Sequence, residues 1–256
     1  MVYAGDYLDA IFPPELEKLG AKKSAKVDAK STSPQKKLFD EIALNLGIET
    51  YDLYLVTGAV DSRVANTSPP SVVVSLDYLN KFKTEERRFI VGRLLEHAEG
   101  RHALALNFPI KQVAQTLMAM AKLFKPEIQV PGLGEADAER LMKAVKRAVP
   151  RKYRKQLEDA AVAFATEGGP RDLASWRQAM NHTANRAGLL VCNDLPAAIS
   201  AMLKTDPRTQ NIRFEDLADP IPILQQSPEA VELIMFAISD AYFTLRKRAG
   251  FSLLSI

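Results

Sequence analysis

The side chains in this sequence that bind metal ions most readily are three histidines and one cysteine, namely His97, His102, His182 and Cys192. In a continuous helix, His97 and His102 would point about 140° apart, because each residue turns the helix by about 100°. That separation does not suit a shared metal, whereas residues four apart differ by only about 40°. The remaining set, His97 with His182 and Cys192, is the one from which a zinc site could be rebuilt.

His97 lies in the segment RFIVGRLLEHAEGRHAL, from Arg88 to Leu104, which has the pattern of an amphipathic helix. Thr84 is the predicted N-cap, and the two glutamates that follow it suit the positive end of the helix dipole. The apolar side is predicted to consist of Phe89, Ile90, Leu94, His97, Ala98 and Leu104. On this pattern alone, His97 is interpreted as a partly buried histidine on a core-facing helix.

One helix and two strands are predicted before this segment. Ser33 as N-cap and Pro34 at the first position begin the helix, and Gly47 ends it. The first strand runs from Tyr51 to Thr57 and alternates apolar with polar residues, and the second is the short β-branched run from Ser71 to Ser75. The residues between the two strands carry turn chemistry and are predicted to form a loop.

Everything after Leu76 is predicted to be helical, apart from breaks rich in proline and glycine. The later helices are expected at about Ile110 to Phe124, Glu135 to Ala148, Lys152 to Thr166, Arg171 to Val191, Pro196 to Lys204 and Ser227 to Ala249. The fold class is therefore α+β, predominantly helical with a small β-sheet.

The first 32 residues are predicted to be an N-terminal segment and a linker. Residues 20–37 are rich in lysine, alanine and serine, with Val27 as the only large apolar residue, which is typical of a solvated segment. Residues 33–256 are predicted to form one domain. The chain starts as if it were already inside a folded region, so we expect it to be a piece of a longer protein.

The order of these elements resembles that of the HtpX-type and CAAX-prenyl-protease-type gluzincin metallopeptidases. VVVSLDYLNKF matches the strand and leucine-rich turn of that family, and TEERRFIVG matches its acidic helix start. His102 matches an additional histidine, and NHTANRAGLL, from Asn181 to Leu190, fits the later E-x-x-A-D segment with Ala184 and Arg186 in place. The resemblance covers about Asp52 to Leu190 and implies a gluzincin-like fold in a bacterial-type protein.

The resemblance also implies which positions would carry zinc chemistry, and most of them are changed. The first zinc-binding histidine of H-E-x-x-H falls on Arg93, the general-base glutamate on Leu94 and the second histidine on His97. The glutamate ligand falls on Asn181, and the aspartate four residues later falls on Asn185. Arginine cannot become a ligand, leucine cannot take a proton from water, and one histidine is too few for zinc. We therefore predict no catalytic residue, no metal and no cofactor.

Two interpretations of Arg93 remain open. It could be a surface or rim arginine paired with Glu96 or another acid. It could instead fill the former metal pocket and pair there with a carboxylate or with Asn181 through charge-assisted hydrogen bonds.

The composition argues against several other classes of protein. The net charge of +3 provides no global field for nucleic acid or membrane, and no apolar run approaches the roughly 20 residues of a membrane span. A single cysteine excludes an internal disulfide and fits a reducing compartment, so a cytoplasmic location is predicted. The basic stretch from Lys143 to Lys155 could bind phosphates, but Pro150 splits it, so nucleic-acid binding is the less favoured alternative.

The leading hypothesis is a catalytically inactive, metallopeptidase-like domain that acts as a structural or protein-interaction module. Its partners would be other proteins or other domains of a longer parent chain, and one partner is predicted to dock along a strand edge at Ser71 to Ser75. The helix from Ser227 to Ala249 is predicted to be buried within the domain rather than against a partner. A divergent zinc metallopeptidase with a rebuilt site is the competing hypothesis.

Overall fold

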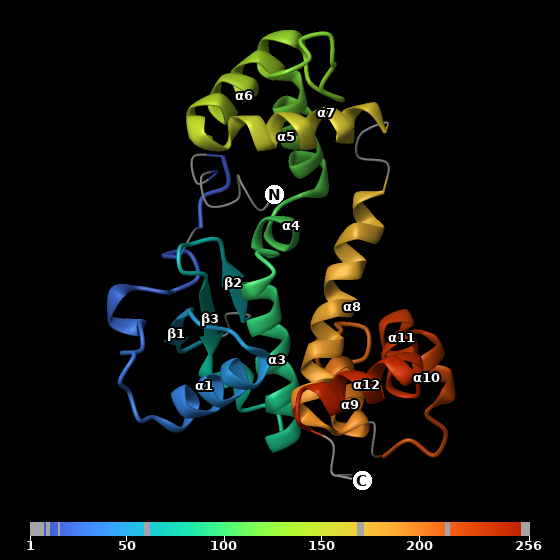
Figure 1. The fold of residues 1–256 in the computed structure, drawn as a ribbon. Helices are drawn as coiled ribbons and strands as arrows, with labels where there is room; N and C mark the ends of the chain where they lie inside the picture. The colour runs from blue at the N-terminus through green and yellow to red at the C-terminus, as the bar shows by residue number, and fades with distance from the viewer. Residues whose placement is uncertain are drawn as a thin grey trace.

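The computed structural model describes residues 8, 11–14, 16–58, 62–167, 172–212 and 216–251. These residues form a mostly helical molecule with a small three-stranded sheet, so the predicted α+β class is confirmed at that level (Figure 1). In chain order, the elements are η2 (Lys23–Ala25), α1 (Pro34–Leu46), β1 (Asp52–Val56), β2 (Arg63–Ala65), β3 (Ser71–Ser75), α2 (Leu76–Leu79), α3 (Thr84–Glu99), α4 (Ala103–Asn107), α5 (Ile110–Lys122), α6 (Glu135–Ala148), η3 (Arg151–Tyr153), α7 (Arg154–Thr166), α8 (Leu173–Cys192), α9 (Leu195–Thr205), α10 (Ile221–Gln225), α11 (Pro228–Ala237) and α12 (Asp240–Arg248).

The sheet has the order β1-β3-β2, with β3 parallel to β1 and antiparallel to β2. All five residues of β3 are buried, which explains why this strand is an unbroken β-branched run rather than an alternating one. The prediction that Ser71 to Ser75 offers a sheet edge is therefore wrong, because neighbouring strands occupy both of its sides. β2 lies in the segment that was predicted to be a loop, and its three residues are too few to show a pattern.

Both outer strands have hydrogen bonds to other parts of the chain. Beside β1, Lys26 forms a bridge with Tyr54, and the Val27 amide donates to the Leu53 carbonyl at 2.8 Å. Beside β2, the Asn107 side-chain amide donates to the Val64 carbonyl at 2.7 Å. The sheet therefore lacks a long free edge in these places, which weakens the case for strand addition.

The first helix follows its predicted signals closely. The Ser33 hydroxyl accepts from the Lys36 amide at 3.3 Å, Pro34 is the first helical residue, and Gly47 ends α1 with φ at 72°. A positive φ strains any residue with a Cβ, so glycine suits this position.

The described residues form two large hydrophobic cores and a smaller third cluster. The first lies between the sheet, α1, α3, the end of α8, α9 and α11. The second is formed by α4 to α7 together with Leu8 and Phe12, whose ring meets Phe108 edge-on at 4.9 Å between centroids.

The N-terminal segment also contributes to packing around the sheet. Leu16, Leu19, Ala21 and Ala25 contact a small third cluster on the sheet face that contains Tyr54. In the predicted solvated stretch from Gly20 to Lys37, most residues before α1 are exposed, but Ala21 is buried and Ala25 is half-buried. The domain boundary at residue 32 stays a prediction.

Two helices end earlier than predicted. The helix that contains His97 ends at Glu99, and Arg101 takes a positive φ of 54° before α4 begins. The long C-terminal helix is divided into α11 and α12, because the Ser239 hydroxyl caps α12 by accepting from the Tyr242 amide at 3.3 Å. Among the described residues, none of the helices combines the length and apolar character needed to cross a membrane.

Candidate functional site: the crossing of α3 and α8

The helices that carry the predicted site residues, α3 and α8, lie side by side (Figure 1). Glycines allow this close approach. A Cβ on Gly92 would lie 2.7 Å from Val191 Cγ2, and a Cβ on Gly188 would lie 2.8 Å from the Phe89 carbonyl oxygen. Neither distance is tolerable for a real Cβ, so both glycines are required for the spacing of the two helices.

Arg93 lines a cavity of about 260 Å³ beside this crossing. Its guanidinium carbon lies 5.7 Å from the centroid of the Phe89 ring, within the range of a cation–π contact. The other lining residues come from the ends of α8, α9 and α11 and the loops beside them, and they are Asn185, Met202, Thr205, Asp206, Pro207, Ser227 and Glu229. The crossing thus places a cation beside a polar cavity.

The guanidinium of Arg93 is not neutralised by a direct partner. Arg93 Nε is buried without a hydrogen-bond partner among the described residues, and so is Oδ1 of Asn185. Burial lowers the pKa of Arg93, while the charges of Tyr78 and Glu229 act in the opposite direction. Arginine keeps its proton in proteins even so, which leaves a positive charge on a half-buried side chain that lines the cavity.

The two interpretations of Arg93 from sequence are therefore both incomplete. The guanidinium lies in a cavity rather than on the surface, yet within the described residues it forms no ion pair with Glu96 and no hydrogen bond with Asn181. Its polar neighbour from α8 is Asn185, the position four residues after Asn181.

Burial and the neighbouring Glu99 raise the pKa of Glu96.

His97 and His102 form a close pair, contrary to the expectation from helical spacing. Their Nδ1 atoms lie 3.1 Å apart, and the rings meet at 68°. The prediction assumed one continuous helix, but the chain turns at Gly100 and Arg101 and carries His102 back over His97. A Cβ on Gly100 would lie 2.4 Å from His102 Nε2, so glycine makes room for the ring.

The histidine pair is held in its neutral form. Burial lowers the pKa of His97 to about 3, with smaller contributions from Arg93 and His102. Burial also lowers the pKa of His102. One ring must donate and the other must accept in the contact between them, which requires at least one neutral ring.

The other residues of the predicted zinc site lie on α3 and α8. Leu94 is partly buried and packs against the first core, and Asn181 and His182 are half-buried on α8. Cys192 lies at the end of α8, where its Sγ contacts the Leu189 and Asp194 carbonyls. No cluster of three or more histidine, cysteine, aspartate or glutamate side chains suitable for a metal occurs in the described ranges. The set of His97, His182 and Cys192 is therefore not assembled.

Cys192 is also unsuited to nucleophilic chemistry. Burial raises the pKa of its thiol to about 12, so it is protonated near neutral pH.

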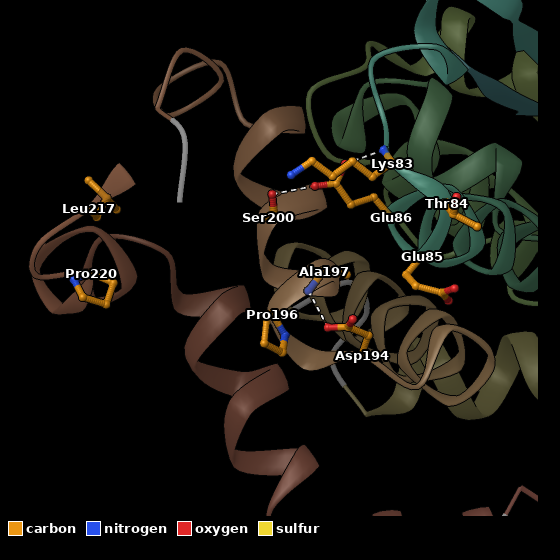
Figure 2. Close-up of a pocket in the computed structure, with 10 residues that line it drawn as sticks. All are labelled: Lys83, Thr84, Glu85, Glu86, Asp194, Pro196, Ala197, Ser200, Leu217 and Pro220. Atoms are coloured by element: carbon orange, nitrogen blue, oxygen red, sulfur yellow. Dashed lines mark hydrogen bonds between the residues drawn. The ribbon is translucent and has the colours of Figure 1, made fainter. Parts of the chain in front are cut away.

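A larger pocket of about 670 Å³ lies where the N-termini of α3 and α9 meet the loop before α10 (Figure 2). Its most buried acid is Glu86, which accepts hydrogen bonds from Ser200 Oγ at 2.7 Å, Lys204 Nζ at 2.7 Å and the Lys83 amide at 2.8 Å. The bonds from Lys204 and Ser200 outweigh burial, and the pKa of Glu86 is lowered. Glu86 is thus a structural anchor between α3 and α9 rather than a free acid or base.

The basic stretch from Lys143 to Lys155 forms the corner between α6 and α7. Within it, Arg154 donates to the Lys146 carbonyl at 3.0 Å, and Lys143 lies 3.5 Å from Glu139. Part of its charge is therefore used inside the corner, and nucleic-acid binding by this stretch stays an untested alternative.

The C-terminal helices expose large apolar side chains. Val231, Met235 and Ile238 follow the spacing of one face of a helix and are all exposed, Ile238 by 66%. Phe243 and Leu245 are exposed on α12. Burial was predicted for this segment, but only Ser227, Ala230, Leu233, Phe236 and Tyr242 are buried in it.

Comparisons with family models, curated proteins and solved structures gave no match for this chain. The resemblance to gluzincin metallopeptidases therefore rests on the quoted residues alone and stays a prediction. Sequence reasoning missed Thr205, Glu229 and the Glu86–Lys204 pair, since each depends on segments far apart in the chain. Ser227 could be predicted from the sequence as the N-cap of α11, but nothing in the sequence indicated that it lines the cavity.

Proposed function

We propose that this chain is a non-catalytic protein-interaction module related to the gluzincin metallopeptidases, and that partners dock on α11 and α12. The observation that carries this proposal is the row of exposed side chains formed by Val231, Met235 and Ile238, with Phe243 nearby in the chain on α12. We call Val231, Met235 and Ile238 the apolar stripe. Exposed apolar groups that are clustered, rather than scattered, are typical of interaction surfaces.

The non-catalytic part of the proposal is supported by the chemistry at the crossing of α3 and α8. A zinc peptidase needs ligands and a general base, whereas this chain has a permanent cation at Arg93 and an apolar side chain at Leu94. His97 is the one zinc-binding position of the family motif that is retained, and its ring already contacts that of His102. The competing hypothesis of a divergent zinc enzyme has no comparable support from these residues.

The occupant we propose for the apolar stripe is an amphipathic helix with acidic residues beside its apolar face. An apolar helix face fits against the stripe, as in other complexes that receive a helix in a groove. At the C-terminal end of α12, Arg246 donates to the Tyr242 hydroxyl and the Phe251 carbonyl, and the next two residues, Lys247 and Arg248, are exposed cations. These cations favour an acidic partner and disfavour a basic one, which gives specificity and orientation.

A pair of synthetic helical peptides tests this proposal directly. Both peptides carry the same leucine face, but one is rimmed with glutamate and the other with lysine. Fluorescence anisotropy with the full chain should detect binding of the glutamate peptide at least about tenfold tighter than the lysine peptide. Met235→Glu should abolish binding, and Leu44→Glu, at an isolated residue that is 80% exposed on α1, should not.

Two results would count against the docking surface. The first is equal binding of the two peptides, and the second is binding that survives Met235→Glu. Concentration-dependent dimerisation of the free chain that is lost in Met235→Glu would assign the stripe to a second copy of the chain instead.

A further inference from the structure

The cavity beside Arg93 has the construction of a binding site for a small polar molecule. Its floor is buried, since Asn185, Met202 and Ser227 are exposed by 1%, 7% and 5%. Its rim includes Pro207, which is exposed, and Glu229, which is half-buried. A volume of about 260 Å³ is below the range of drug-sized ligands, so it suits a compact metabolite.

Two polar atoms on this cavity have unused hydrogen-bonding capacity. Arg93 Nε can only donate and Asn185 Oδ1 can only accept, and neither has a partner among the described residues. Unpaired buried polar atoms also occur at Ser62, Arg177, His182 and Glu232, but Arg93 and Asn185 line the same cavity, where one polar occupant would satisfy both. An occupant that satisfies both must offer an acceptor to Arg93 and a donor to Asn185.

The charges around the cavity define the occupant further. Glu229 acts on Arg93 through space, but the two side chains form no ion pair in the described structure. Asp206 is not available in the same way, because its carboxylate accepts from Arg208 at 2.6 Å. Among the described residues, the cavity is thus lined by a cation, Arg93, a carboxylate, Glu229, that forms no ion pair with it, and the amide oxygen of Asn185, which has no hydrogen-bond partner.

We infer that this cavity binds a small zwitterion with a carboxylate and a protonated amine, that is, a free α-amino acid with a compact apolar side chain. The carboxylate would pair with the Arg93 guanidinium, whose fork geometry suits it. The amine would donate to Asn185 Oδ1 and face Glu229. Met202 and Pro207 supply the apolar part of the lining. This inference does not depend on docking at the apolar stripe.

The structure also explains why Arg93 would be kept for binding rather than for stability. Arg93 is half-buried and forms no ion pair among the described residues, so an apolar side chain of similar length would remove no stabilising pair. Arg93→Met should therefore leave the melting temperature of the ligand-free chain unchanged or raised. The same variant should lose the response to ligand, because the carboxylate partner is gone.

The test uses the full chain, with thermal unfolding and isothermal titration calorimetry. The probes are L-alanine, L-valine and L-methionine, with acetate and methylamine as the two halves of the zwitterion and sulfate as a plain anion. At least one amino acid should raise the melting temperature in a saturable way, and neither half should do so at the same concentration. Glu229→Gln should weaken binding at least tenfold, and Arg140→Met, at an exposed residue on α6, should not change it.

Three results would overturn the inference. The first is no saturable response to any of the three amino acids, which would mean that the cavity holds water. The second is a response to acetate or sulfate equal to that of the amino acids, which would make it a simple anion site. The third is an unchanged response in both Arg93→Met and Glu229→Gln, which would place binding elsewhere.

Discussion

The Nδ1 atoms of His97 and His102 lie 3.1 Å apart, across the end of α3. This contact exists because Arg101 adopts a positive φ of 54° and Gly100 leaves room for the His102 ring. The pair makes the stability of the chain dependent on pH in a definite direction.

Stability should fall as pH decreases below 6.5. The pKa of His97 is lowered from 6.5 to about 3, so between these values the unfolded chain binds a proton that the folded chain does not. Each such proton costs the folded state about 1.4 kcal/mol per pH unit. Urea unfolding at pH 7.0, 6.0 and 5.0 measures how steeply the free energy of unfolding changes with pH. The pKa of Glu86 is lowered, so its carboxylate loses its contribution to stability only below this pH range.

A variant separates the histidine pair from other causes of acid sensitivity. His97→Leu with His102→Leu should flatten the pH dependence between 6.5 and 5, whatever its effect on stability at pH 7. An unchanged slope in this double variant would assign the effect to other groups.

The Glu86–Lys204 ion pair should be important for stability. Lys204→Met would leave the buried Glu86 carboxylate without its cation, at a cost of about 3 kcal/mol. Lys143→Met is the matched control, because Lys143 pairs with Glu139 at the surface and should cost less than about 0.5 kcal/mol. Equal losses in the two variants, measured by chemical denaturation, would show that the buried pair has no special role.

The glycines at the crossing of α3 and α8 should resist substitution. Gly188→Ala places a Cβ against the Phe89 backbone, which cannot move without shifting the helix, and should cost about 1–3 kcal/mol. Thr183→Ala, at an exposed position of the same helix, should change the free energy of unfolding by less than about 0.5 kcal/mol. A tolerant Gly188→Ala would mean that the two helices are less tightly packed than described.

Restoring the family's zinc residues tests how the motif is placed on this sequence. Arg93→His, Leu94→Glu and Asn181→Glu together should raise zinc affinity well above that of the wild type, since they would join His97. Competition with a chromophoric chelator measures this. A triple variant with no gain in affinity would mean that the proposed correspondence with the metallopeptidase motif is wrong.

Local signals in the sequence were enough to predict much of the helical structure. The cap at Ser33, the stop at Gly47 and the bounds of α6 at Glu135–Ala148 all follow from short-range chemistry and are confirmed. The central position of β3 could have been inferred from its continuous β-branched run, which is typical of a strand buried on both faces.

The features that sequence reasoning missed depend on backbone geometry or on distant segments. Arg101 is a non-glycine residue with a positive φ, and no pattern in the sequence announces the turn that brings His102 onto His97. The cavity needs α3, α8, α9 and the start of α11 together, so periodicity within one element could not reveal it. The exposure of Met235 and Ile238 likewise depends on what the rest of the fold leaves uncovered.

The non-catalytic part of the proposed function depends most directly on the claim that the crossing of α3 and α8 is not a zinc site. Elemental analysis of the chain, purified without added metal and without chelator, measures this. The account predicts zinc far below one atom per chain, with no change in His97→Ala. One zinc atom per chain that is lost in His97→Ala would contradict it and favour a divergent metallopeptidase.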